Sequence, residues 1–344
     1  MAEVKRINLA LQGGGAHGAF TWGALEVLLQ DPEIEIAGIT GTSAGALNGA
    51  ALKSGLIRAG RDGALESLEA LWTRMGALQG DALSAWLTGI GPGGVARAME
   101  FSLPYVMGET WSRLVSPYHY GPLYQNPLQP VVEAFDFGEV CAEAGPRLFV
   151  CATNVRTGKA RVFTRDEIST EAILASACLP TMFQAVEIDD PETGRKEAYW
   201  DGGYTGNPAL FPLFHKDLPD DVVIININPL VREEKPVTPQ QIHSRINEIS
   251  FNAALLGELR AISFVQRLLD SGALIEGDMK AVKVHMIADD ALMNDLSVAT
   301  KTVPTSYILG ELRRAGQEAA SAFLEAHKAD LGQRGTVDLQ ATYR

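Results

Sequence analysis

Two spacings of apolar residues alternate along the first eighty residues of the chain. Residues 4–11 and 34–40 are short, mostly apolar runs of strand length. Residues 16–29, 44–54 and 62–79 instead carry apolar side chains three or four apart, as one face of a helix does. A regular alternation of strands and helices is typical of a parallel sheet covered by helices. The pattern therefore predicts an α/β fold with a mostly parallel central sheet.

The middle of the chain changes character twice. Residues 81–125 are rich in Trp, Pro and Gly and carry little charge, which predicts short helices and loops with apolar surfaces. Beyond them, pairs of short runs separated by turn sequences predict two hairpins, and a continuous apolar run predicts a buried strand: 147–155 with 159–164, 184–189 with 196–200, and 222–229.

A long helical spacing begins after Pro239 and ends at Gly272. A strand over 281–288 and a helix over 306–331 are expected to complete the chain. A stripe of apolar residues on a helix normally faces a core, and we expect the same of the residues on this one: Ile242, Ile246, Ile249, Leu256, Leu259, Ile262, Val265 and Leu269.

The charge balance limits the classes of partner. Acidic residues outnumber basic ones, 42 to 29, and the formal net charge is −13. Binding of nucleic acid needs clustered Lys and Arg, so no nucleic-acid partner is expected. The same charge disfavours purely electrostatic docking on an anionic membrane, although it leaves contact with lipid through apolar side chains open.

Cysteine usage and the terminal sequence indicate a compartment. Cys141, Cys151 and Cys178 have neither the spacing of a metal site nor that of a disulfide framework, and we expect free thiols. The first residues lack the pattern of a secretory signal, and no window of about 18 uncharged apolar residues predicts a membrane span. We therefore expect a cytoplasmic protein, with peripheral contact to a membrane or lipid aggregate as an option.

The first stretch that indicates chemistry is Gly41-Thr42-Ser43-Ala44-Gly45, which fits G-x-S-x-G. It stands between an expected strand and an expected helix, where such a motif presents a nucleophilic serine on a tight turn. Gly41 and Gly45 leave room in that turn, and the following helix directs its N-terminal amides toward Ser43. A helix N-cap serine without catalytic function is the alternative interpretation.

The second stretch is Gly13-Gly14-Gly15-Ala16-His17-Gly18, which also follows a strand and precedes a helix. Consecutive amides in such a turn bind an anion. One interpretation is an oxyanion hole, in which these amides hold the negative oxygen of a tetrahedral acyl intermediate. Because neighbouring parallel strands end at the same edge of a sheet, this turn and the serine turn are expected side by side.

A dinucleotide site is the competing interpretation of the same glycines. Gly13, Gly15 and Gly18 satisfy G-x-G-x-x-G, and an acidic residue about twenty positions further on is present at Glu33 or Glu35. The oxyanion hole is favoured because it explains the glycine turn and the serine turn together.

The third stretch is Asp201-Gly202-Gly203, which follows the second expected hairpin. In chain order, Ser43, Asp201 and His285 would match the triad of an α/β-hydrolase. His285, however, lies inside an apparent strand rather than in a loop. A carboxylate can act as the base itself if its site raises its pKa above that of free Asp, about 3.9.

Taken together, these stretches resemble the patatin-like phospholipase family, whose serine in G-x-S-x-G and aspartate in D-G-G/A form a catalytic dyad. The matching residues are Ser43 and Asp201, and the glycine turn 13–15 corresponds to the family's oxyanion hole. The stretches "ASACLPTMF" (175–183) and "DGGYTGNPAL" also fit in order and spacing. One departure is His17, where many members of the family carry Arg or Lys.

The resemblance implies a three-layer α/β/α fold and hydrolysis of acyl esters of lipids, phospholipids or lysophospholipids included, without a cofactor or metal. It implies a catalytic domain over residues 1–230 and leaves residues 231–344 as a helical extension without assigned chemistry. The apolar segment 83–118, with Trp86 among its aromatic residues, is expected to form an acyl pocket, a lid or an ordinary helical cap. A lipid-binding regulatory protein without catalysis remains the alternative from a different class.

Overall fold

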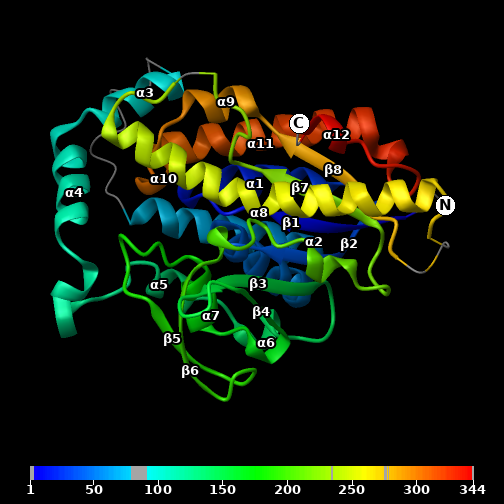
Figure 1. Cartoon of the computed structure of the whole chain (residues 1–344), viewed down its shortest axis with the longest axis horizontal. Coiled ribbons are helices and arrows are strands. Elements are labelled where there is room, and N and C mark those ends of the chain that lie inside the picture. Colours follow the sequence, from blue (N-terminus) through cyan, green and yellow to red (C-terminus); the bar gives the residue numbers. More distant parts are fainter. Residues whose placement is uncertain (1–3, 79–90, 234, 275–276, 278, 343–344) are drawn as a thin grey trace.

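The computed structural model describes residues 4–78, 91–233, 235–274, 277 and 279–342 (Figure 1). The apolar runs of the sequence form a single sheet in the order β5-β6-β3-β2-β1-β7-β8, with β4 paired to β3. The strands are β1 (Lys5–Leu11), β2 (Ile34–Gly41), β3 (Arg147–Asn154), β4 (Ala160–Thr164), β5 (Val186–Asp190), β6 (Arg195–Asp201), β7 (Asp221–Asn226) and β8 (Lys283–Ala288).

The centre of the sheet is parallel and one side of it is antiparallel. Strands β3, β2, β1, β7 and β8 pair in parallel, whereas β4, β5 and β6 join as antiparallel hairpin strands. The prediction of an α/β fold with a mostly parallel sheet is confirmed, and so are the two predicted hairpins.

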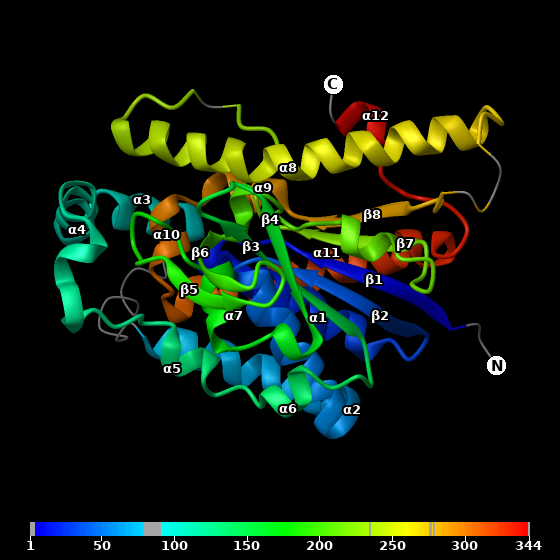
Figure 2. The same ribbon diagram turned by 60° about the horizontal axis from the view of Figure 1, so that its bottom comes forward.

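Each face of the sheet packs against a separate core, because successive side chains of a strand point to opposite faces. Leu9 and Leu11 of β1 pack with residues of α1, α2 and α11, whereas Ala10 packs with residues of α8 and α12. Figure 2 shows α8 and α12 above the sheet and α1 and α2 below it. This arrangement is the expected three-layer α/β/α architecture.

The helices begin and end close to the expected positions. Helix α2 runs through the predicted break between 54 and 62 with a kink at Ala59 and Gly60. The helices are α1 (Gly18–Gln30), α2 (Ala44–Ala77), α3 (Gly91–Glu100), α4 (Leu103–Leu114), α5 (Gln129–Val132), α6 (Phe137–Val140), α7 (Thr170–Ser176), α8 (Pro239–Asp270), α9 (Asp290–Asp295), α10 (Val298–Thr302), α11 (Ser306–His327) and α12 (Leu339–Thr342), with 3₁₀ turns η1 (Gly15–His17) and η6 (Gly202–Tyr204) at the functional loops.

The part of the chain after residue 230 is integrated with the rest. Its strand β8 extends the sheet beside β7, and its helix α11 packs along α1. Its short helix α10 lies against the glycine turn at η1. The division of the chain at residue 230 into a catalytic domain and an extension stays a prediction.

The N-terminal half of α8 departs from the expected core-facing stripe. Ile242, Ile246 and Ile249 are exposed, and the buried side chains of this half are Glu248 and Asn252. The inward positions serve polar contacts instead, because Glu248 pairs with Arg232 and Asn252 donates to the Pro229 carbonyl. In the C-terminal half Leu259 and Ile262 are buried as predicted, and the other three predicted residues, Leu256, Val265 and Leu269, are half-buried.

The described helices do not have the properties of a membrane span. None of those in the described ranges combines the length and the apolar composition that a transmembrane span requires. Trp86, which the sequence assigned to an acyl pocket, a lid or an ordinary helical cap, lies outside the described residues.

Candidate active site

Ser43 stands between the end of β2 and the start of α2, as the G-x-S-x-G motif predicts. Its backbone has φ 54° and ψ −120°, a conformation that non-glycine residues rarely adopt. The Ser43 amide donates to Ser176 Oγ at 2.9 Å, and Ser176 Oγ donates to the Cys151 carbonyl at 2.6 Å. A residue held in a strained turn by surrounding contacts is typical of a functional site.

The glycines on either side of Ser43 permit close approach of other backbone. A Cβ on Gly45 would lie 2.1 Å from the Leu11 carbonyl oxygen, and one on Gly41 would lie 2.5 Å from the Gly45 carbonyl oxygen. A side chain at position 45 would therefore displace the turn from the end of β1, and one at position 41 would distort the turn itself.

Asp201 reaches Ser43 because two strands meet end to end. Strand β3 pairs with β4 along one edge, so β2 and β6 share its other edge. Along that edge β2 ends with Gly41 opposite Val150, and β6 arrives from the opposite direction with Asp201 opposite Ala152. The turn after β2 and the carboxylate at the end of β6 thus come together, and the Ser43 side chain lies close enough to Asp201 to lower the pKa of its carboxyl.

The Asp201 carboxyl is 1% exposed, and burial raises its pKa to about 7. The hydrogen bond from the Gly203 amide, at 2.7 Å, and the nearby Ser43 side chain lower the pKa but offset only part of the effect of burial. The backbone around it is fixed, because Asp201 N donates to the Cys178 carbonyl and Thr153 Oγ1 donates to the Asp201 carbonyl. A carboxyl of this pKa can accept and return a proton near neutral pH.

Gly202 and Gly203 form the 3₁₀ turn that follows Asp201. A Cβ on Gly202 would lie 2.1 Å from the Cys151 carbonyl oxygen, and one on Gly203 would lie 2.9 Å from the ring of Phe251 on α8. The two glycines therefore let β3 and α8 close over the carboxylate, which explains its burial.

Gly13, the first glycine of the N-terminal turn, packs directly on Ser43. A Cβ at this position would lie 2.7 Å from the Ser43 Cβ. Its amide donates to Asn207 Oδ1 at 2.6 Å, and its carbonyl accepts from Asn228 Nδ2 at 2.7 Å. The sequence predicted that the amides of Gly13, Gly14 and Gly15 all face the oxyanion. Because the Gly13 amide is already bonded to Asn207, only the amides of Gly14 and Gly15 are left for that role.

Gly14 and Gly15 lead into η1, where the first amides have no acceptor within the helix. Gly15 has φ 58° and packs against the Lys301 carbonyl, which would lie 2.3 Å from a Cβ. A third amide of the same kind belongs to Ala44, the first residue of α2 and the one after Ser43. These amides can stabilise an anion beside the serine.

His17 and Gly18 attach this turn to neighbouring helices. The buried His17 ring bonds through Nε2 to Thr300 Oγ1 at 2.8 Å, and Thr300 donates its proton to the Ser297 carbonyl. Nε2 therefore carries the proton, and burial lowers the pKa of His17, so the ring is neutral. A Cβ on Gly18 would lie 2.7 Å from the Ala44 Cβ, so Gly18 permits contact between α1 and α2.

The alternatives left open by the sequence receive no support from these positions. His285 lies on β8, which β7 and β1 separate from β2, and its buried ring bonds to Asp221 and Thr336, so it does not complete a triad. Glu33 pairs with Lys328 and Glu35 with Arg6 at the start of β2, the opposite end of that strand from the glycine turns. A ribose bound near the turn would be out of reach of both carboxylates.

Several positioning residues were not recognised from the sequence. Ser176 and Asn207 lie in stretches that resemble the family, yet neither has a local pattern that shows its contact with a glycine or serine turn. Asn228 and Thr300 come from distant parts of the chain, so only the fold brings them to the turn. Within the described residues, no group of three His, Cys, Asp or Glu side chains is arranged to hold a metal ion.

Comparisons with known proteins bear on the same region. A sequence model of the family described as patatin-like phospholipase matches residues 9–214. No curated protein sequence matches the chain. Among solved structures, the crystal structure of VipD from Legionella pneumophila is similar, with 16% sequence identity, a TM-score of 0.44, and coverage of 94% of this chain and 67% of that one.

Proposed function

The chain belongs to the patatin-like phospholipase family, and from this premise we propose that it hydrolyses acyl esters of phospholipids or lysophospholipids. The family implies a lipid acyl hydrolase. The finer proposal is a mechanism with Ser43 as nucleophile and Asp201 as the only general base, through an acyl-enzyme.

In the first half-reaction Ser43 Oγ attacks the ester carbonyl carbon while its proton passes to the Asp201 carboxylate. The tetrahedral intermediate carries a negative oxygen. Amides of Gly14, Gly15 and Ala44 stabilise that oxygen, while Gly13 holds the turn against Ser43. Asp201 then gives the proton to the departing alcohol, and the acyl group stays on Ser43.

In the second half-reaction water attacks the acyl carbonyl and its proton passes to Asp201. Collapse of the intermediate releases the fatty acid and returns the proton to Ser43 Oγ. A pKa of about 7 suits both roles, because a carboxyl near this value is an effective base when ionised and an effective acid when protonated.

The observation that carries the proposal is the position of Ser43, on a strained turn beside the buried Asp201 carboxyl whose pKa burial raises to about 7. A fluorophosphonate probe tests it. We expect the probe to label the wild type covalently and to leave Ser43→Ala unlabelled, with release of fatty acid from lysophospholipid lost in the same variant.

Two results would contradict this proposal. A folded wild type that does not react with the probe would favour the lipid-binding regulatory protein. Labelling that persists in Ser43→Ala would place the nucleophile elsewhere. The variant Ser54→Ala is a matched control, since Ser54 lies in the same helix with its hydroxyl bonded to Glu139.

A further inference from the structure

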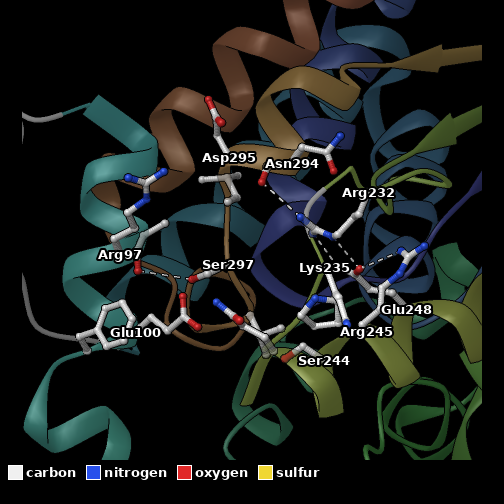
Figure 3. A pocket seen from close by; sticks show the side chains of 16 residues that line it. Arg97, Glu100, Arg232, Lys235, Ser244, Arg245, Glu248, Asn294, Asp295 and Ser297 are labelled. Carbon is white, nitrogen blue, oxygen red and sulfur yellow. Dashed lines mark hydrogen bonds and ion pairs between the residues drawn. The ribbon is translucent and has the colours of Figure 1, made fainter. Parts of the chain in front are cut away.

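A pocket lies between α3 and the start of α8, and α10 separates it from the glycine turn. It has a volume of about 250 Å³, and Ser297 and Val298 at the start of α10 line it. The same short helix carries Thr300 and Lys301, which contact His17 and Gly15. Figure 3 shows Arg97 and Glu100 on α3 facing the wall that carries Arg232 and Lys235.

This pocket concentrates positive charge in an acidic chain. Arg232, Arg245 and Lys301 all pair with the single carboxylate of Glu248, at 2.7, 3.3 and 3.3 Å. One carboxylate cannot neutralise three cations, so positive charge remains where Arg232 and Arg245 line the pocket. Burial raises the pKa of Glu248, but Arg232 and Lys301 outweigh this effect and lower the pKa to about 2.

Two further cations line the pocket without such a partner. Arg97 and Lys235 form no ion pair with any described residue, although Glu100 and Asp295 also contribute to the lining. The pocket therefore presents more cationic than anionic groups. Arginine in particular suits a phosphate, because its planar donors match the phosphate oxygens.

Exposed apolar side chains surround the pocket. Phe101 lines it and is 70% exposed, and Val237, beside Lys235, is 74% exposed. The outward face of α8 continues the apolar surface, and so does α4, which Figures 1 and 2 place at the same end of the molecule: Ile242, Ile246, Ile249, Leu103, Met107 and Trp111. Exposed apolar area of this extent marks an interaction surface.

We propose that this face docks on a surface of anionic phospholipid, with a headgroup phosphate in the pocket and the apolar side chains in the acyl region. Cations beside exposed apolar residues match an anionic amphiphile better than a soluble phosphate, which would leave the apolar side chains in water. The local positive charge overcomes the repulsion expected from a net charge of −13. The docked face would hold the protein beside its lipid substrate, so this inference rests on the proposed function.

Vesicle flotation of the Ser43→Ala variant tests the proposal without turnover. We expect binding to vesicles that contain phosphatidylglycerol and little binding to pure phosphatidylcholine. Adding Arg97→Gln and Lys235→Gln should weaken binding about fivefold for each removed cation. Removal of Arg74 and Lys159, exposed cations outside the pocket, should have no such effect.

Two valine substitutions test the contribution of the exposed apolar side chains to vesicle binding. Val237→Asp should reduce vesicle binding, whereas Val4→Asp, at another exposed valine, should not. Folding of every variant is checked by thermal unfolding. Binding that ignores vesicle charge, or an Arg97→Gln, Lys235→Gln variant that binds like its parent, would overturn the proposal.

A soluble ligand is distinguished by inorganic phosphate. Phosphate that raises the unfolding temperature of the parent but not of the pocket variant, without vesicle binding, would identify a site for free phosphate and overturn lipid docking. Intact charge-dependent binding by a wild type that hydrolyses no ester would instead contradict the proposed function alone.

Discussion

Two buried carboxyls on either side of the glycine turn have pKa values that are shifted in opposite directions. Asp201 and Glu248 are 1% and 4% exposed, yet the pKa of Asp201 is about 7 and that of Glu248 about 2. Burial raises both values. The partners decide the outcome, because Asp201 has only an amide and a hydroxyl, whereas Glu248 has Arg232 and other cations.

The difference separates a chemical site from a supporting one. A carboxyl that exchanges its proton near neutrality suits acid–base catalysis, and one that stays ionised suits a permanent counter-ion. Burial alone would not have distinguished the two regions.

The largest expected effect concerns activity at Asp201. We expect Asp201→Asn to lower kcat/KM for a lysophospholipid at least about a thousandfold, because the amide cannot accept the Ser43 proton. In the wild type kcat/KM should rise with pH to a plateau above the Asp201 pKa of about 7. Steady-state kinetics from pH 5 to 9 measures both, and a profile without a limb in this range would exclude Asp201 as the base.

The stability of the same variant should change in the opposite direction. The folded pKa of Asp201 is raised above its ordinary value of 3.8, so the folded state loses stability as the pH rises from about 4 to about 7. Asp201→Asn removes this titration and should stabilise the protein by about 2–4 kcal/mol at pH 8 and not at pH 4. Urea unfolding at the two pH values is the measurement. Equal gains at both would point to packing rather than ionisation.

Glu248 should show the reverse dependence on pH. Its pKa is lowered, so its contribution to stability is present above its ordinary value of 4.5 and is lost as the pH falls toward 2. We expect Glu248→Gln to cost about 2 kcal/mol at pH 7, allowing for solvent screening of its partly exposed partners. Glu318→Gln removes an exposed ion pair with Arg314 and should cost under about 0.5 kcal/mol.

The smallest expected effect concerns α10, the helix that lies between the glycine turn and Glu248. Thr300→Val leaves the buried His17 ring without its acceptor and should cost about 1–2 kcal/mol, with a loss of kcat of a few-fold as the glycine turn loosens. Thr302→Val is the control, since the Thr302 hydroxyl bonds only to carbonyls of its own helix. Equal effects of the two variants would show that the bond between Thr300 and His17 does not support the glycine turn.

The sequence predicts local features of the fold well. Runs of apolar residues and turn sequences indicated the parallel strands and both hairpins, because a strand or turn is determined by its own residues. The apolar stripe on α8 gave a wrong prediction of burial for Ile242, Ile246 and Ile249. Spacing indicates which residues share a face of a helix but not which face points inward.

The candidate site is only partly encoded locally. Motifs indicated Ser43, Asp201 and the glycine turn, each beside a strand end. Engagement of the Gly13 amide by Asn207 depends on a contact between distant segments, and so does the bond of His17 to Thr300. No spacing along the chain reports such contacts.

The end-to-end meeting of β2 and β6 along one edge of β3 has a consequence for the order of assembly. During synthesis Ser43 is made long before β3 and β6, and the contact that brings Asp201 to it joins residues far apart in the sequence. Under the mechanism we propose, an emerging chain carries Ser43 without its base, and ester hydrolysis begins only when the antiparallel half of the sheet has formed. Onset of the proposed activity would then report a late step of folding, after the helices and the parallel strands have formed.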